Sequence, residues 1–136
     1  MILTDAGPLV ALIDLEERAH ERCMAVLRIE SGPMVTIWPA FSEAMYLVRS
    51  AGGWRFQKAL WQMRERHALL IHELDAVATD RARELMAGYR DLPMDLADAT
   101  LVAAAEVLGA TRIFTLDSHF RADRTRGGAS FSILPA

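Results

Sequence analysis

Short apolar runs alternate along the chain with longer segments in which apolar residues recur every three or four positions. The runs end at polar or turn residues and predict strands over 2–4, 34–37, 68–71, 112–116 and 131–134. The periodic segments predict helices over 9–13, 20–27, 39–51, 54–66, 76–86 and 94–108. Strands that alternate with helices favour a parallel sheet covered on both faces. We therefore expect an α/β protein with three layers, α/β/α, around a central, mostly parallel sheet of about five short strands.

Two of these helices carry expectations about the core. The helix over 39–51 is expected to bury a stripe formed by Ala40, Ala44, Leu47, Val48 and Ala51. The helix over 76–86, with Asp75 as its cap, is expected to bury Val77, Ala78, Ala82, Leu85 and Met86.

The helix within residues 92–106 is apolar nearly all round, which is typical of a helix inside a fold. Two carboxylates, Asp95 and Asp98, nevertheless lie three residues apart in its first turns and share one face. Ionised carboxylates are costly to bury unless they are paired, hydrogen-bonded or bound to metal. Helix capping and a functional role explain Asp95 equally well. Capping explains Asp98 less well, because Asp98 lies on the apolar stripe of this helix.

Four acids are predicted to meet at one edge of the sheet. Asp5 directly follows the first strand and Asp117 directly follows the fourth. Glu43 lies early in the helix after the second strand, and Asp98 lies early in the helix before the fourth. Turn or cap chemistry explains each acid alone, but it does not explain their convergence at the edge where parallel sheets bind ligands.

Carboxylates a few ångströms apart raise each other's pKa and destabilise a fold. Hard divalent cations with oxygen ligands, above all Mg²⁺ or Mn²⁺, remove that repulsion. With two such ions, one can activate a water while both stabilise a phosphodiester under in-line attack. The histidines are scattered without zinc spacing, and we expect core or surface roles for His20, His67, His72 and His119.

Other phosphate and hydrolase machinery is missing from the sequence. It contains no Gly-x-x-x-x-Gly-Lys-Ser/Thr loop, no Gly-x-Gly-x-x-Gly and no Gly-x-Ser-x-Gly elbow. An aspartyl-phosphate enzyme is a rival, but such proteins usually need a lysine after a later strand. The only lysine, Lys58, lies in the middle of a predicted helix.

Composition limits the class of protein to which the chain can belong but does not identify its function. The chain has 136 residues, 52% apolar and 24% charged, which suits a single globular domain over residues 1–136. It has no run long enough for a membrane span and no basic leader, and the lone Cys23 suits a reducing, cytoplasmic location. The net charge of −3 at first argues against nucleic acid, but two bound divalent ions would bring it to +1, so it excludes little.

Successive segments of the chain resemble the motifs of PIN domains, in particular those of VapC-type toxins. The matching segments are Thr4–Leu9 with Asp14, Ser42–Glu43, Asp95–Leu101 and Thr115–Phe120. The resemblance spans essentially the whole chain. It implies a PIN-like fold and an Mg²⁺- or Mn²⁺-dependent endoribonuclease, usually a homodimer, usually inhibited by a small antitoxin encoded beside it.

The resemblance also assigns roles to residues. Asp5, Glu43, Asp98 and Asp117 match the metal-binding acids of the family. Asp95 matches a position that is acidic only in some members. Thr115 matches a polar position beside the site, from which it would orient Asp117.

Contacts to RNA are less defined by the sequence. The candidates for phosphate contact are Arg49, Arg112, Arg121, Arg124 and Arg126. The last three crowd the loop just after Asp117, where a solvated loop is the alternative explanation. Trp54 and Trp61 could stack on a base or an antitoxin helix, although dimer or core roles explain them better.

Two functions remain open from the sequence. The first is a toxin that hydrolyses RNA phosphodiesters by metal-activated water, with no membrane association. The second is a PIN-fold module that binds RNA or protein with weak or absent nuclease activity. The presence of all four matched acids favours the enzyme.

Overall fold

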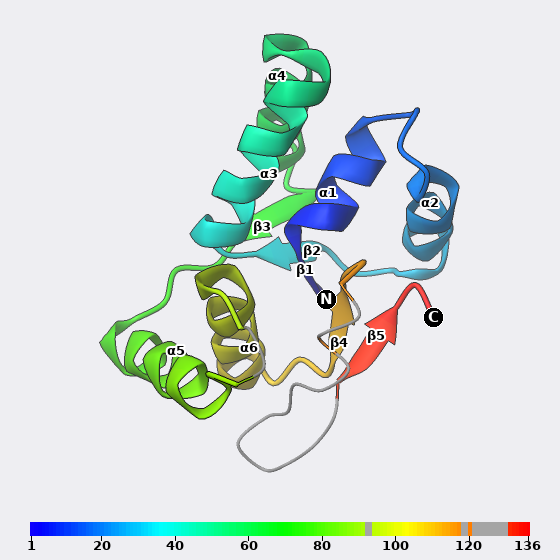
Figure 1. Cartoon of the computed structure of the whole chain (residues 1–136). Coiled ribbons are helices and arrows are strands. Elements are labelled where there is room, and N and C mark those ends of the chain that lie inside the picture. Colours follow the sequence, from blue (N-terminus) through cyan, green and yellow to red (C-terminus); the bar gives the residue numbers. More distant parts are fainter. Residues whose placement is uncertain (92–93, 118–119, 121–130) are drawn as a thin grey trace.

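A fully parallel sheet forms the centre of the computed structural model, which describes residues 1–91, 94–117, 120 and 131–136. Its strands are β1 (Ile2–Thr4), β2 (Met34–Thr36), β3 (Leu69–Ile71), β4 (Arg112–Phe114) and β5 (Ser132–Leu134). They are ordered β3-β2-β1-β4-β5, so the first strand of the chain is the central one (Figure 1). None of the described helices is long and apolar enough to cross a membrane.

Six helices connect and cover these strands. They are α1 (Ala6–Ile13), α2 (His20–Ile29), α3 (Trp38–Gly52), α4 (Trp54–Glu65), α5 (Ala76–Gly88) and α6 (Leu96–Leu108). Helix α1 begins at Ala6, three residues earlier than the sequence suggested, because Asp5 caps it and Pro8 is accommodated in its first turn.

The alternation of side chains along the strands produces two separate cores. Leu3, Val35 and Ile113 face α5 and α6. Ile2, Met34 and Phe114 face the opposite side and pack with α1 to α4. Figure 1 shows these two helix groups apart, with the strands between them. The predicted three-layer α/β/α class is confirmed.

The expected core stripe of α3 was partly wrong. Leu47 and Ala51 are exposed, whereas Phe41 is buried and its ring lies 5.1 Å from the ring of Trp61 on α4. The buried face is turned toward Phe41 because α3 packs against α1 and α4, while the side with Leu47 lines a cavity. The burial predicted for Val77 was also wrong, since this residue is 78% exposed in the first turn of α5.

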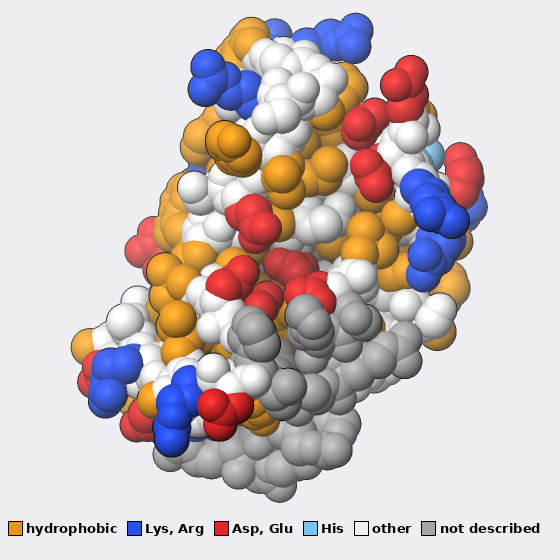
Figure 2. Space-filling view, in the orientation of Figure 1, with side chains coloured by type: hydrophobic (Ala, Val, Ile, Leu, Met, Phe, Trp, Pro, Cys, Tyr) orange, Lys and Arg blue, Asp and Glu red, His pale blue; other side chains and the backbone are white. Residues whose placement is uncertain are grey.

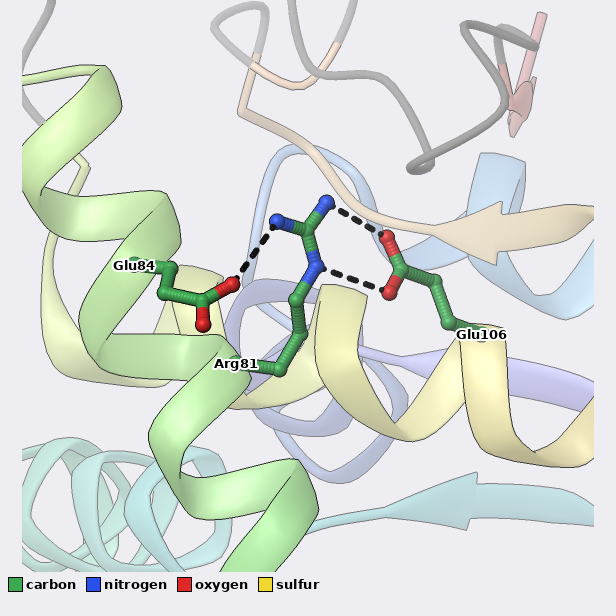
Figure 3. Close-up of polar contacts among 3 residues, drawn as sticks. All are labelled: Arg81, Glu84 and Glu106. Carbon is green, nitrogen blue, oxygen red and sulfur yellow. Dashed lines mark hydrogen bonds and ion pairs between the residues drawn. The ribbon is translucent and has the colours of Figure 1, made fainter.

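A bidentate ion pair joins α5 to α6 (Figure 3). The guanidinium of Arg81 donates from Nε and Nη2 to the two carboxylate oxygens of Glu106, at 3.0 Å each. Glu84 lies 3.6 Å from the same guanidinium. The side chains of Arg81 and Glu106 are only 18% and 17% exposed, so water screens this pair weakly. It therefore helps to fix α6, the helix that carries Asp95 and Asp98.

We predict that Glu106→Gln lowers the free energy of unfolding by roughly 1–2 kcal/mol, because it removes one charge of a bidentate, half-buried pair. The matched control is Glu21→Gln, which breaks a 3.7 Å pair with Arg28 whose side chains are 80% and 64% exposed. Its effect should stay below about 0.5 kcal/mol. Urea denaturation of both variants measures the difference, and equal losses would contradict the assignment.

Candidate functional site

A cavity of about 270 Å³ opens at the carboxyl edge of the sheet. Its lining is formed by Asp5, Ala6, Gly7, Glu43, Leu47, Asp95, Asp98, Leu116 and Asp117. The four acids predicted from the sequence, and Asp95, thus lie around one hollow, which we call the acid cavity. Figure 2 shows acidic side chains gathered at the centre of this face.

Asp5 enters the acid cavity from the end of the central strand. Its extended backbone places it as the N-cap of α1, where its Oδ1 accepts a hydrogen bond from the backbone N–H of Ala6 at 2.8 Å. Its Oδ2 accepts a hydrogen bond from the Thr115 hydroxyl at 2.9 Å. Both oxygens of this buried carboxylate are therefore held in place by the protein.

Thr115 connects the ends of β1 and β4 through one buried hydroxyl group. The Oγ1 atom donates to Asp5 and accepts from the backbone N–H of Asp117 at 3.0 Å. The contact to Asp117 thus runs through the backbone of that residue. The same hydroxyl fixes the backbone that carries one acid and the side chain of another.

Asp95 and Asp98 form a capping box at the start of α6. The Oδ1 of Asp95 accepts from the backbone N–H of Asp98 at 2.8 Å, and the Oδ2 of Asp98 accepts from the backbone N–H of Asp95 at 3.4 Å. Capping and cavity lining coincide here, because the helix begins at the edge of the sheet. Asp98 is only 8% exposed, whereas Asp95 lies toward solvent.

The crowded carboxylates perturb one another. Burial, followed by repulsion from Asp95 and Asp5, raises the pKa of Asp98 to about 8. Burial also raises the pKa of Asp5, partly offset by its hydrogen bonds from Ala6 and Thr115. The pKa of Glu43 is raised as well, by desolvation first and then by the other acids. The ionised forms of these carboxylates are therefore disfavoured in the acid cavity, and a bound cation would stabilise them.

The donor atoms of the acid cavity are carboxylate oxygens, which are the ligands of hard divalent cations such as Mg²⁺ and Mn²⁺. Within the part of the chain that the structure describes, no three Asp, Glu, His or Cys side chains are already gathered tightly enough to hold a metal ion. The donor chemistry and the mutual repulsion nevertheless fit such an ion, since its charge would offset the cost of crowding these acids.

The described histidines, His20, His67 and His72, and two of the candidate arginines do not line this cavity. His20 is buried, and its Nδ1 contacts the carbonyl oxygen of Ala11 at 2.6 Å, so it is a core residue. Arg112 begins β4 at the opposite edge of the sheet, where it pairs with Glu30, and it does not line the acid cavity. Arg49 lies exposed in the last turn of α3 and does not line the acid cavity.

Several predicted residues fall outside the described part of the chain. These are His119 and the three loop arginines, Arg121, Arg124 and Arg126.

The sequence reasoning missed two basic residues near the acids. Arg18 and Arg22 line a second cavity of about 490 Å³, together with Thr115, Leu116 and Asp117. They belong to a polar stretch around the start of α2, and no local pattern links this stretch to the end of β4. Only the tertiary packing of the fold reveals their position.

Comparisons with known proteins agree with this geometry. The family model described as PIN domain matches residues 2–124. The chain is 26% identical over 135 residues to Ribonuclease VapC26 of Mycobacterium tuberculosis, covering 98% of this chain and 100% of that protein. The fold is similar to the crystal structure of VapC20 of Mycobacterium tuberculosis, described as a sarcin-ricin loop cleaving toxin, with a TM-score of 0.82, 18% identity and coverage of 90% and 94% of the two chains. It is also similar to a chain of a toxin-antitoxin complex from Klebsiella pneumoniae, with a TM-score of 0.64, 18% identity and coverage of 87% and 88%.

The raised pKa of Asp98 predicts how stability depends on pH without divalent ions. The folded state keeps a proton that the unfolded state releases between its ordinary pKa of 3.8 and about 8, so the free energy of unfolding should fall as pH rises through this window. Asp98→Asn should flatten the fall and be more stable than the wild type by roughly 1–3 kcal/mol at pH 8, with little difference at pH 4.

Urea denaturation in EDTA at several pH values tests this expectation. The matched control is Asp80→Asn, which removes an exposed carboxylate from α5, outside the acid cavity. It should follow the wild-type profile. Parallel profiles for Asp98→Asn and the wild type would show that Asp98 is not under electrostatic strain.

Proposed function

Because the chain belongs to the PIN domain family, we propose that it is a metal-dependent endoribonuclease that hydrolyses RNA phosphodiester bonds as the toxin of a VapBC-type toxin–antitoxin pair. The observation that carries the proposal is the acid cavity, where five described carboxylates from four separate segments meet at the carboxyl edge of the sheet. Similarity along the full length of a protein named as a ribonuclease supports it. We treat residues 1–136 as its single nuclease domain.

In this proposal Asp5, Glu43, Asp98 and Asp117 hold Mg²⁺ or Mn²⁺, and Asp95 is an additional acid at the exposed rim. A bound divalent ion supplies a Lewis acid for the phosphate and a water nucleophile that is available at neutral pH. The cation also allows Asp98 to remain ionised despite its burial.

The chain's own residues hold the acids in place for this chemistry. The Thr115 hydroxyl and the Ala6 N–H bind both oxygens of Asp5, so this carboxylate has few orientations. The capping box orients Asp98 from the first turn of α6, a helix buried along most of its length. Thr115 is thus a positioning residue, because it acts through Asp5 and the backbone of Asp117.

The shape of the site favours unpaired RNA. A hollow of about 270 Å³ is too small for a duplex, but it can receive one phosphodiester of a strand that is splayed open. Single-stranded or looped RNA in the cytoplasm is therefore the proposed substrate.

Partners are proposed from exposed apolar surface near α4. Trp54 is 64% exposed, and Phe56 and Met63 line an apolar cavity of about 500 Å³ between α4 and the first two helices. Leu60 and Trp61 are less available, since Leu60 is fully buried and Trp61 packs on Phe41. We propose a homodimer and an antitoxin helix that uses part of the same neighbourhood. Similarity to a chain of a toxin-antitoxin complex supports the second partner.

We predict that solution scattering at micromolar concentration gives the mass of two chains. Trp54→Glu should shift this mass toward one chain, because a charge at an apolar contact is costly to desolvate. Val77→Glu, at another exposed apolar position, on α5, is the control that should keep the dimer. A monomeric wild type would contradict the dimer.

The reaction itself gives a further prediction. Purified protein with Mg²⁺ or Mn²⁺ should cleave structured RNA and leave a 5′-phosphate and a 3′-hydroxyl, because water attacks phosphorus and the described lining of the acid cavity offers no histidine or lysine to activate a 2′-hydroxyl. EDTA should stop cleavage, and Asp98→Asn should abolish it while the protein stays folded. Thr115→Val should lower kcat roughly 10- to 100-fold, and Thr115→Ser, which keeps the hydroxyl, should restore most of it.

Mapping of the RNA ends decides between the mechanisms. A 2′,3′-cyclic phosphate, or cleavage that survives EDTA, would overturn the proposed chemistry. Full activity of Asp98→Asn would remove Asp98 from the catalytic set. If metal-loaded protein free of antitoxin binds RNA but cleaves none, the chain is a binding module.

A further inference from the structure

A second cavity lies directly beside the acid cavity. It has a volume of about 490 Å³, and its lining is formed by Glu17, Arg18, Ala19, Arg22, Thr115, Leu116, Asp117, Ile133 and Pro135. Leu116 and Asp117 line both cavities, so the two hollows meet at this short segment after β4. A chain molecule bound across Asp117 would therefore occupy both of them.

The two cavities differ in charge. The described lining of the acid cavity contains five carboxylates and no cationic side chain. Among its described lining residues, the second cavity has two arginines, Arg18 and Arg22, and the carboxylates of Glu17 and Asp117. Figure 2 shows basic side chains gathered over α2, across an apolar strip from the central acids. Of these two cavities, only the second has cationic side chains among its described lining residues.

The backbone that carries these arginines is held by the core. In the turn before α2, the N–H of Glu17 donates to the carbonyl of Asp14 at 3.0 Å, and the N–H of His20 donates to the carbonyl of Glu17 at 2.9 Å. The buried His20 ring then fastens the start of α2 to the carbonyl of Ala11. Arg18 and Arg22 are exposed, and no ion pair engages either one among the described residues. Their guanidinium groups are thus available to a ligand, on a backbone that needs little ordering.

The chemistry of the second cavity suits one nucleotide. Guanidinium groups bind phosphate oxygens through paired N–H donors. The same lining includes Leu116, Ile133 and Pro135, which offer an apolar surface for the face of a base. The volume lies within the range of pockets that hold small organic ligands.

We propose that the second cavity is a nucleotide subsite, in which Arg18 and Arg22 bind a phosphate that flanks the scissile phosphodiester of an RNA strand. This inference rests on the proposed ribonuclease function. It adds the place at which the RNA strand leaves the acid cavity. The subsite offsets the repulsion between the polyanionic substrate and the five carboxylates, and it sets the direction of the strand across Asp117.

Binding measurements test the subsite separately from catalysis. The background is Asp98→Asn protein in EDTA, titrated with a fluorescent single-stranded oligoribonucleotide and followed by anisotropy. Arg18→Gln and Arg22→Gln should each weaken binding roughly five- to tenfold at low salt, and each lost phosphate contact should reduce the slope of log affinity against log salt by about 0.7. Arg28→Gln is the matched control, because it removes the same charge from α2, the helix of Arg22, outside the second cavity. It should bind like the background.

Cleavage assays of the same arginine substitutions, made in otherwise wild-type protein, complete the test. With Mg²⁺, Arg18→Gln and Arg22→Gln should raise KM more than they lower kcat, because they bind the substrate away from the reacting atoms. If the wild type cleaves RNA and both variants behave like Arg28→Gln, the subsite is wrong and the proposed function stands. If nothing cleaves but the two variants selectively weaken binding, the proposed function is wrong and the nucleotide site stands. If the background binds no oligoribonucleotide at all, the subsite is overturned.

Discussion

The repulsion among carboxylates at the carboxyl edge of the sheet is the constraint on which the rest of the structure depends. Asp5 and Asp98 are buried in the same small cavity as Asp117. Burial first, and then repulsion from neighbouring carboxylates, raises the pKa of Asp5 and of Asp98. The fold resists this repulsion with hydrogen bonds to individual carboxylate oxygens and with two apolar cores that fix the elements carrying them.

Helix α6 shows how one element serves packing and chemistry together. Nine of its residues are buried, so its position is determined by the core and by the Arg81–Glu106 pair. Because its axis is fixed, the capping box at its first turn delivers Asp98 to the edge of the sheet. The acids that begin the helix also satisfy backbone N–H groups, so the polar start of this apolar helix carries no unpaired donor at Asp95 or Asp98.

Much of this arrangement could be predicted from the sequence, for physical reasons. A parallel sheet places the residues that follow its strands at one edge, so Asp5 and Asp117 could be located from strand ends alone. The rotation of α3 about its own axis could not be predicted. Packing against α4 decides that Phe41 is buried and Leu47 is exposed. Arg18 and Arg22 were missed for a similar reason: their proximity to Asp117 is created by tertiary contacts between segments about a hundred residues apart.

The hydrogen bond between Thr115 and Asp5 joins residues separated by 110 positions in the chain. The strands β1 and β4 are neighbours in the sheet, but β1 precedes β4 in the sequence and so leaves the ribosome well before it. A nascent chain that has not yet reached β4 therefore carries Asp5, Glu43 and Asp98 without the hydroxyl that fixes Asp5 and without Asp117. Translation products that stop before β4 therefore lack two of the groups that build the site.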